Sequence, residues 1–287
     1  MLNLTLSGPE SEMMDGAKEA RITEPAERQH ARPDLTGCYF YHTMDLPVLG
    51  VVRGAWHIRD FRQYIGSVDL RGKTVLDVGT ASGFLSFEAE RAGAARVVSF
   101  DADSVERMYR LPFGDNLFWT DFPAWVKHPQ QSWLDGLKKS YRVAHGLLGS
   151  KAQTCYGDIF HLRTLFPGTF DVTIAGAMLE HINDPVSALA NMAMVTRERL
   201  IIAFTPIIES DEIILRAATQ IADPASDFTW WTASRGTYRK VLENMGFQIE
   251  RIVPSVAFFE PKGELESRST LVARRRNTGR VRDTIPA

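Results

Sequence analysis

The stretch Thr74–Ser86, TVLDVGTASGFLS, constrains the fold of this chain more than any other. The apolar residues around Leu76 predict a short buried strand. Gly79 and Gly83 then permit tight backbone turns and the close approach of a ligand, and a helical apolar pattern follows at once. A strand that passes through a glycine loop into a helix is typical of nucleotide-binding α/β folds. The question is which nucleotide this loop accommodates.

The same alternation of strand-like and helix-like segments continues along the chain. The pattern predicts strands at 74–79, 95–101, 152–158, 169–177, 199–206, 248–256 and 268–276, and helices at 83–93, directly after Asp103, at 185–196 and at 235–247. Short apolar strands that alternate with helices form a parallel sheet covered on both faces. The last two strands have no helix between them, so they should pair as an antiparallel hairpin. The sequence therefore predicts an α/β fold with a mostly parallel seven-stranded sheet and a C-terminal antiparallel hairpin.

Composition divides the chain into an arm, one domain and a tail. Residues 1–36 are polar and acidic, and we expect them to form a mobile N-terminal arm. The alternative is a short helix around Glu12–Glu19 that lies over a site. Residues 37–275 form the domain and residues 276–287 a C-terminal tail. Two inserts, 104–150 and 207–233, interrupt the alternation, and inserts after strands of such a sheet lie at its carboxyl edge, where ligands bind. Their aromatic residues are Phe113, Phe118, Trp119, Phe122, Trp125, Trp133, Phe228, Trp230 and Trp231. These rings either pack the inserts onto the body or line a substrate pocket.

The overall composition excludes several classes of protein. A hydrophobic content of 44% with 24% charged residues is that of a soluble globular protein. A net charge of −2 argues against a nucleic-acid partner. Two cysteines, Cys38 and Cys155, provide neither a disulfide framework nor a metal site. No apolar run is long enough to span a membrane, and the N-terminus lacks the pattern of a secretory signal, so we expect a cytoplasmic protein.

The loop itself excludes two common nucleotide classes. A dinucleotide dehydrogenase would carry G-x-G-x-x-G, and a phosphate-binding P-loop would end in Gly-Lys-Ser/Thr. Asp77 instead stands directly before the glycines, where it would repel a pyrophosphate and suit an ammonium group. Asp101 ends the second strand, a position suited to ribose hydroxyls, and Asp158 ends the third, where it would accept from an exocyclic amine. Each carboxylate alone is more often a cap or turn residue, but three at successive strand tips indicate a nucleoside ligand.

Taken together, these motifs resemble those of the class I S-adenosylmethionine-dependent methyltransferases over about residues 50–275. The matching segments are Val75–Gly83, the acidic strand end at Asp101, Gly157–Asp158 and Phe170–Pro185. The resemblance implies a Rossmann-like fold with helices on both faces of the sheet, and S-adenosylmethionine as the cofactor. At Ala81 the sequence departs from the commonest family pattern, which has a glycine there.

The resemblance also implies roles for individual residues. Gly79, Thr80, Ala81, Ser82 and Gly83 would border the methionine part of the cofactor. Asp77 would hold its amino group, Asp101 its ribose and Asp158 its adenine amine, with Ala102, Gly157, Ile159 and Gly176 as adjacent contacts. Arg59 would clamp the cofactor carboxylate, unless it forms a surface salt bridge.

The identity of the methyl acceptor depends on a finer resemblance. The segments YHTMDLP, WHIRDFRQYI and LRGKTVLDVGTASGF resemble a subgroup related to wobble-uridine tRNA methyltransferases and to small-molecule methyltransferases of natural-product pathways. The near-neutral charge and the aromatic inserts favour a small aromatic acceptor of secondary metabolite biosynthesis, with an indole as one candidate. Modification of a tRNA wobble uridine is the alternative, and a non-catalytic cofactor-binding protein or a Rossmann oxidoreductase ranks below both. The oligomeric state stays open between a monomer and a homodimer.

Candidates for catalysis come from two segments. The sulfonium methyl group is already activated, so the protein must align a nucleophile with it, and a base is needed only if that nucleophile loses a proton. His181 and Glu180 follow the fourth strand, and His181 is the first choice for substrate contact or base. Tyr41, His42 and His57 precede the sheet. For each histidine the alternative is a packed, hydrogen-bonded structural residue.

Overall fold

A computed structural model of the chain describes residues 33–109, 124–217 and 229–276, with the side chains of 124–130 left aside. The expected N-terminal arm and C-terminal tail therefore fall almost entirely outside the described residues. So do the insert residues Phe113, Phe118, Trp119, Phe122 and Phe228 and the side chain of Trp125. In the described part of the chain no helix is both long and apolar enough to cross a membrane.

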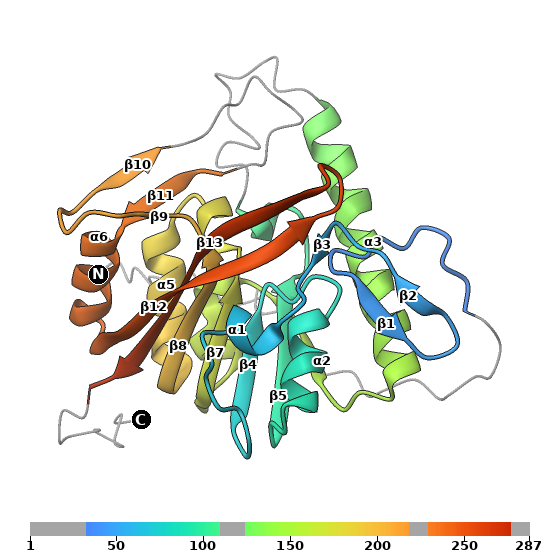
Figure 1. Ribbon diagram of the computed structural model, residues 1–287, viewed down its shortest axis with the longest axis horizontal. Coiled ribbons are helices and arrows are strands. Elements are labelled where there is room, and N and C mark those ends of the chain that lie inside the picture. The colour runs from blue at the N-terminus through green and yellow to red at the C-terminus, as the bar shows by residue number, and fades with distance from the viewer. Residues whose placement is uncertain (1–32, 110–123, 218–228, 277–287) are drawn as a thin grey trace, which may run out of the picture.

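An eight-stranded sheet forms the centre of the molecule (Figure 1), in the order β3-β12-β13-β8-β7-β4-β5-β6. Five strands run parallel: β4 (Thr74–Val78), β5 (Arg96–Ala102), β6 (Gln153–Gly157), β7 (Phe170–Gly176) and β8 (Thr196–Thr205). The long strands β12 (Phe247–Phe259) and β13 (Glu264–Arg275) form an antiparallel hairpin, and β13 pairs antiparallel with β8. The predicted fold class and its seven strands are confirmed. The two-residue strand β3 (Trp56–His57) joins as an eighth, which the sequence did not predict.

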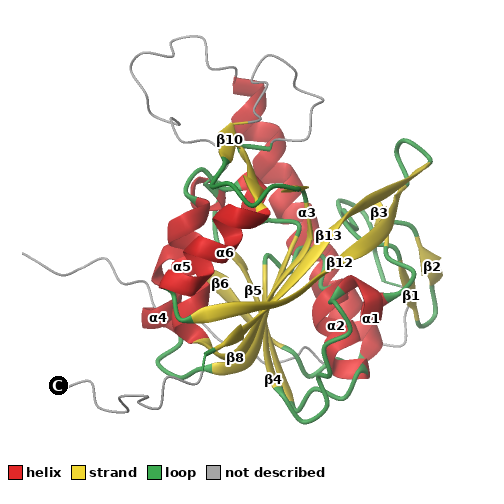
Figure 2. Cartoon of the chain, turned by 60° about the vertical axis from the view of Figure 1, so that its left-hand side comes forward, coloured by secondary structure: helices red, strands yellow, loops and turns green. Residues whose placement is uncertain are grey.

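Helices cover both faces of the sheet. Figure 2 shows α4 (Leu162–Leu165), α5 (Pro185–Val195) and α6 (Arg235–Asn244) on one side, and α1 (Phe61–Tyr64) and α2 (Phe84–Arg91) on the other. The helix α3 (Ala124–Leu148) packs in the same layer as α2, through Tyr141 and Ala144. Because neighbouring residues of a strand point to opposite faces, Val75 belongs to the α1–α3 layer and Leu76 to the α4–α6 layer.

The helix expected directly after Asp103 is a wrong prediction. Over the described residues only a single 3₁₀ turn, η1 (Glu106–Met108), forms there, and it ends at Tyr109, whose backbone adopts the left-handed conformation with φ of 53°. The first insert instead contributes α3. Its buried residues Leu134, Leu137, Tyr141 and Ala144 recur at helical spacing, which is why this face packs against the body.

The remaining strands lie outside the main sheet. A hairpin of β1 (Met44–Leu46) and β2 (Gly50–Val52) follows the N-terminal segment. In the second insert β9 (Ile207–Ile208), β10 (Leu215–Ala217) and β11 (Trp231–Ser234) form a small sheet in the order β10-β11-β9. Because β9 follows the end of β8 directly, this small sheet stands at the carboxyl edge of the main sheet, as expected for the insert.

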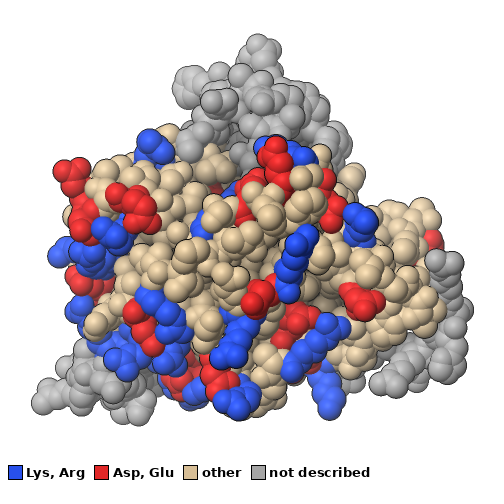
Figure 3. Space-filling model, viewed as in Figure 1, with Lys and Arg blue, Asp and Glu red and all other residues tan. Residues whose placement is uncertain are grey.

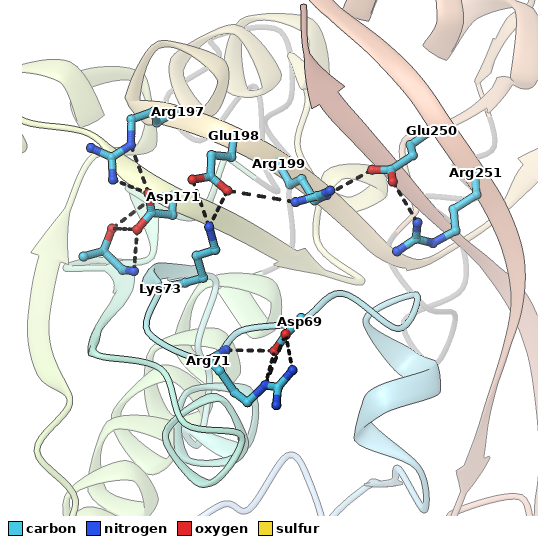
Figure 4. Close-up of polar contacts among 10 residues, drawn as sticks. Asp69, Arg71, Lys73, Asp171, Arg197, Glu198, Arg199, Glu250 and Arg251 are labelled. Atoms are coloured by element: carbon cyan, nitrogen blue, oxygen red, sulfur yellow. Dashed lines mark hydrogen bonds and ion pairs between the residues drawn. The ribbon is translucent and has the colours of Figure 1, made fainter.

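The amino edge of the main sheet carries a chain of ion pairs (Figure 4). Lys73 Nζ lies 2.7 Å from a carboxylate oxygen of Glu198, and Arg199 lies 3.9 Å from Glu198 and 3.0 Å from Glu250. These contacts connect the beginnings of β4, β8 and β12. Polar contacts that hold the strands in register therefore occupy one edge of the sheet, and the opposite edge carries the pocket described below.

Candidate functional site

A pocket of about 110 Å³ lies at the carboxyl edge of the sheet, beside the glycine loop. The ends of β4, β5, β6 and β7 form its floor. It brings together nine of the residues predicted from the sequence, namely Tyr41, Gly79, Ala81, Asp101, Ala102, Gly157, Ile159, Gly176 and His181. Residues far apart in the sequence thus meet where a parallel sheet binds ligands.

The loop after β4 turns through three residues in the left-handed region. Gly79 has φ of 77° and Gly83 has φ of 94°, conformations that glycine adopts without strain. Ala81 also has a positive φ, 52°, which is uncommon for a residue with a side chain. The Ala81 amide donates to Asp101 Oδ2 at 2.8 Å, and the Gly79 amide donates to the Phe100 carbonyl at 2.9 Å. The loop is therefore tied to the end of β5 in a conformation that suits glycine better than alanine.

Asp77 lies buried beneath this loop and is not among the described residues that line the pocket. Its Oδ2 accepts hydrogen bonds from the hydroxyls of Thr80 (2.8 Å) and Ser86 (2.7 Å). Its Oδ1 has no hydrogen-bond partner among the described residues. Burial raises the pKa of this carboxyl to about 6. A buried acceptor without a donor is costly, so an incoming ammonium group, directly or through a water, fits this position.

Asp101 presents its carboxylate at the pocket wall. Its Oδ1 accepts from the amide of Ala102 at 2.8 Å and its Oδ2 from the amide of Ala81, so both oxygens are oriented by the backbone. Its contact with ribose hydroxyls stays a prediction.

Asp158 is the N-cap of the 3₁₀ turn η2 (Ile159–His161). Its carboxylate accepts from the Phe160 amide at 2.8 Å and from the Tyr109 hydroxyl at 2.7 Å, and it pairs with His161 Nδ1 at 3.1 Å. Asp158 is not among the described residues that line the pocket, whereas its neighbours Gly157 and Ile159 are. The adenine contact of Asp158 stays a prediction, beside its evident capping role.

Ser82 docks the N-terminal segment onto the loop. Its fully buried hydroxyl accepts hydrogen bonds from the amides of Tyr41 (3.1 Å) and His42 (3.3 Å). The side chain therefore faces the N-terminal segment, and the cofactor contact of Ser82 stays a prediction. This docking brings Tyr41 to the pocket wall.

Two aromatic rings from different segments line the pocket. Tyr41 and Trp133, on α3, have ring centroids 6.4 Å apart and nearly perpendicular planes. Leu137 and Met108 of the first insert complete this wall. In the second insert, by contrast, the Trp230 amide donates to the Glu180 carbonyl and Trp231 Nε1 donates to the Asn183 carbonyl at 2.9 Å. The first insert thus lines the pocket. The described tryptophans of the second insert form hydrogen bonds with the segment after β7.

The candidates for catalysis fall into different places. His181 lines the pocket and is 7% exposed. Glu180, its neighbour in the turn η3 (Leu179–His181), is not a described lining residue of this pocket, and its buried carboxylate pairs with Arg268 at 3.2 Å. His42 packs against Phe84 with ring centroids 5.3 Å apart, and burial lowers its pKa to about 3, which keeps the imidazole neutral.

His57 and Arg59 lie away from the site as the structure describes it. His57 lines a separate pocket between the β1–β2 hairpin and α2. The guanidinium of Arg59 lies 6.0 Å from the ring centroid of Phe258. Neither residue is among the described residues that line the pocket beside the loop. Their predicted roles therefore receive no support from this geometry.

Several residues at or beside the site escaped the sequence analysis. Met178 and Ile182 line the pocket, and both lie within three residues of His181 in the sequence. Because His181 was already a candidate, its position in the sequence could have indicated both residues. The Tyr64 hydroxyl lies 3.5 Å from the position that a Cβ would occupy on the lining residue Gly176, and Arg268 pairs with Glu180, directly before the lining residue His181, but nothing in the local sequence marks Tyr64 or Arg268. Only the pairing of distant strands and helices brings them there.

Comparison with known proteins identifies the domain type. The model of a methyltransferase domain matches residues 55–252 of this chain. Among curated proteins, the ribosomal protein L11 methyltransferase of Aliivibrio salmonicida is 49% identical over 41 residues, which are 14% of this chain and 14% of that protein. The chain thus matches about one seventh of the length of that relative.

Solved structures with a similar fold include several methyltransferases. The magnesium protoporphyrin IX methyltransferase from Synechocystis PCC 6803, solved with bound SAM, is 17% identical, with 75% of this chain and 76% of that chain covered and a TM-score of 0.43. A putative RNA methyltransferase from Pyrococcus horikoshii is 15% identical, with 75% and 82% covered and a TM-score of 0.44. The N-terminal domain of EvdMO1, solved with SAH and D-fucose, is 13% identical, with 83% and 91% covered and a TM-score of 0.48.

Proposed function

The chain belongs to the methyltransferase family whose domain covers residues 55–252, with S-adenosylmethionine as methyl donor, and we propose that it methylates a small aromatic acceptor. An indole-containing metabolite of a biosynthetic pathway is our leading candidate for that acceptor. The observation that carries the proposal is the pair of rings, Tyr41 and Trp133, on the wall of the pocket that also contains Gly79 and Asp101. Rings in such positions stack on planar ligands.

The residues present suit the cofactor. Gly79 and Ala81 would border its methionine part, the unpartnered Oδ1 of Asp77 would meet its amino group, and Asp101 would hold its ribose. Gly157 and Ile159 would border the adenine. When bound, S-adenosylmethionine supplies an activated, electrophilic methyl group.

The remaining task of the protein is to orient the acceptor and keep water out. Apolar lining residues such as Met178, Ile182 and Leu137 support exclusion of water, and fixed aromatic walls restrict the acceptor to few orientations. His181 is the lining imidazole, so it is the candidate to accept a proton if the acceptor nucleophile carries one. We propose Glu180 as a residue that positions this segment through Arg268 rather than as the base.

Charge favours a small acceptor over RNA. The net charge is −2, and Figure 3 shows Lys and Arg interspersed with Asp and Glu over the face in view rather than in a continuous basic stripe. Binding to RNA depends strongly on basic residues that neutralise phosphates. Methylation of a tRNA wobble uridine is therefore the second candidate.

A direct assay separates the candidates. The full chain is incubated with S-adenosylmethionine labelled in its methyl group and, in parallel, with indoles, phenols, aromatic amines and bulk tRNA. We expect label in at least one aromatic compound and none in tRNA. Label in tRNA alone would replace our proposal by the RNA alternative. Cofactor binding without transfer to any acceptor would indicate a non-catalytic binding protein.

A further inference from the structure

A line of buried hydroxyl groups ends on Asp77. The Tyr141 hydroxyl, on α3, donates to Ser99 Oγ on β5 at 2.8 Å, and the Ser99 hydroxyl donates to Ser86 Oγ on α2 at 2.6 Å. The Ser86 hydroxyl in turn donates to Asp77 Oδ2, on β4, at 2.7 Å. Two strands and two helices are therefore joined by consecutive hydrogen bonds. We name Tyr141, Ser99 and Ser86 the hydroxyl chain.

The hydroxyl chain lies inside the hydrophobic layer that covers one face of the sheet. Asp77, Ser86 and Ser99 are 0% exposed, and Tyr141 is 1% exposed. Tyr141 belongs to the same hydrophobic cluster as Phe87. Polar groups in such a layer destabilise the fold unless each finds a partner. The chain provides those partners, and a carboxylate at its end accepts the last proton donated.

The donors of the chain all point towards the carboxylate. A hydroxyl has one proton, so Ser86, which donates to Asp77, has none left for a carbonyl of its own helix. Ser140, on α3, shows the other arrangement, since its hydroxyl donates to the Gly136 carbonyl at 2.9 Å. Hydrogen bonds that point the same way polarise one another. The chain therefore stabilises an ionised Asp77 more than a single hydroxyl would.

Opposing influences set the charge of Asp77. Burial raises the pKa of its carboxyl to about 6, the carboxylate of Asp101 on β5 acts in the same direction, and the hydroxyls that donate to Asp77 act against both. Two phenols also face Asp77, Tyr64 from α1 and Tyr141 from α3. Both keep their protons near neutral pH, because burial raises the pKa of Tyr141 to about 12 and that of Tyr64 well above its usual range. A change in the donors therefore changes the charge of Asp77.

We propose that the hydroxyl chain holds Asp77 ionised for the ammonium group of S-adenosylmethionine, and that Ser99 and Tyr141 are positioning residues for cofactor binding. Neither is among the described residues that line the pocket, so both act through Asp77. The Oδ1 of Asp77, which has no partner among the described residues, would accept from that ammonium directly or through a water. The inference rests on the proposed function, since it concerns the cofactor of that same site.

The proposal gives α3 two roles in one site. Trp133 and Leu137 on this helix line the pocket, and Tyr141, one turn further along, begins the hydroxyl chain. The first insert would thus contribute to the wall of the pocket and to the charge beneath the glycine loop.

Proton release on binding tests the proposal. S-adenosylhomocysteine, whose own ammonium and carboxylate keep their charges over this range, is titrated by calorimetry into the full chain at pH 5 to 7.5, in two buffers with different heats of ionisation. Because binding requires the ionised carboxylate, we expect about half a proton to pass from Asp77 to the buffer at pH 6 and about none at pH 7.5. Affinity should fall up to about tenfold for each pH unit below 6. Asp77→Asn should remove both effects.

Variants along the chain measure the contribution of each donor. Loss of a donor to the ionised form favours the protonated form, so the midpoint of the Asp77 titration should move to higher pH. We expect a rise of about one pH unit in Ser86→Ala, and of about 0.2–0.5 unit in Ser99→Ala and in Tyr141→Phe, which act through polarisation. NMR of protein labelled with ¹³C in its aspartate carboxyls, with the Asp77 signal assigned through Asp77→Asn, resolves shifts of this size.

Two matched variants control for loosening of the core. Ser140 is as buried as Ser99 and precedes Tyr141 on α3, but its hydroxyl bonds to a carbonyl of its own helix. Tyr238 is a buried phenol on α6, in the opposite layer. Ser140→Ala and Tyr238→Phe should therefore keep the wild-type midpoint. Shifts in these controls as large as those in the chain variants would refute a specific role of the chain.

The outcomes separate this inference from the proposed function. No binding of S-adenosylhomocysteine at any pH would overturn the cofactor itself. Binding without proton release, or a pH dependence that Asp77→Asn retains, would overturn the ammonium contact of Asp77 and leave the cofactor standing. A midpoint that moves in Ser86→Ala but in neither Ser99→Ala nor Tyr141→Phe would overturn the chain beyond its direct donor. If one of these last two variants does not fold, the other decides.

Discussion

Three single residues set the chemistry of the loop after β4. Asp77 is fully buried, and two hydroxyls donate to one of its oxygens while the other has no partner among the described residues. Ala81 accepts backbone strain at a position where glycine would have none. Asp101 is held in place by two amides. Each of these features leads to a measurable consequence.

The carboxyl of Asp77 should make stability depend on pH. Burial raises its pKa from 3.8 to about 6, so the folded state binds this proton more tightly than the unfolded state does. The stability from this group is fully present below pH 4 and is lost as the pH rises through 6, on the order of 3 kcal/mol. Urea unfolding of the cofactor-free wild type and of Asp77→Asn, at several pH values between 4 and 7, measures the difference. A difference that stays constant over this range would contradict the raised pKa.

Replacement of Ala81 by glycine should relieve strain. A left-handed φ costs a residue with a Cβ about 1 kcal/mol, part of which the greater freedom of glycine in the unfolded chain offsets. We expect Ala81→Gly to raise the free energy of unfolding by about 0.5 kcal/mol with cofactor affinity retained. Ala81→Val, which adds a branched side chain at the same φ, should lower it. Chemical denaturation of both variants checks the order, and a destabilised Ala81→Gly would refute the argument.

Loss of the Asp101 carboxylate should remove cofactor binding. Asp101→Ala deletes the predicted ribose acceptor and also the tie between β5 and the Ala81 amide. We expect at least about a hundredfold weaker binding of S-adenosylhomocysteine by calorimetry, the loss typical of hydrogen bonds to a charged group. Asp69→Ala is the matched control, because Asp69 pairs with Arg71 at 2.7 Å and neither residue is among the described residues that line the pocket. Wild-type affinity in Asp101→Ala would exclude the ribose assignment.

At the scale of elements, the periodicity of the sequence predicts the regular strands well and the inserts poorly. The seven strands and α2, α5 and α6 were predictable because their apolar patterns are local and end at clear stop signals such as Gly93 and Gly246. The helix after Asp103 was a wrong prediction, because Tyr109 turns the backbone there and its hydroxyl bonds to the distant Asp158. Tertiary contacts of this kind override local propensity.

The amino ends of β4 and β7 are joined by one carboxylate. Asp171 accepts from the Thr74 amide at 2.8 Å and hydroxyl at 2.9 Å, and pairs with Arg197. Although burial by itself raises the pKa of Asp171, these hydrogen bonds lower it to about 2. The resulting stability is present above pH 4 and is lost as the pH falls towards 2.

Asp171→Asn should therefore lower the free energy of unfolding by about 1–2 kcal/mol at pH 7, and by less as the pH falls towards 2. Urea unfolding at pH 7 and pH 3 measures this. Glu198→Gln, which breaks a partly exposed pair on the same edge, serves as the comparison and should cost less than about 1 kcal/mol. Equal losses in the two variants would show that the bond to Thr74 contributes nothing.

At the scale of the whole molecule, two hydrophobic layers share one sheet and leave its carboxyl edge for ligands. The amino edge is occupied by ion pairs (Figure 4). The pocket draws on β4, β5, β6 and β7, on α3 from the first insert, and on the N-terminal segment docked by Ser82. The second insert reaches the same edge, where Trp230 and Trp231 donate hydrogen bonds to carbonyls of the segment after β7. The pocket thus depends on segments from the entire domain.

The sheet and the glycine loop were predictable from the sequence, because strand periodicity, glycine spacing and acidic strand ends are local signals. The cofactor S-adenosylmethionine followed from the resemblance of these motifs to those of class I methyltransferases. The sequence did not predict which side chains would contact one another in the folded protein. Glu180 and His181 are adjacent in sequence, yet one pairs with Arg268 and the other lines the pocket. Tyr41 and Trp133 reach the pocket over long sequence separations, through the docking of the N-terminal segment and the packing of α3. Such contacts arise only when the whole chain folds, so the aromatic wall of the pocket was decided by the tertiary structure.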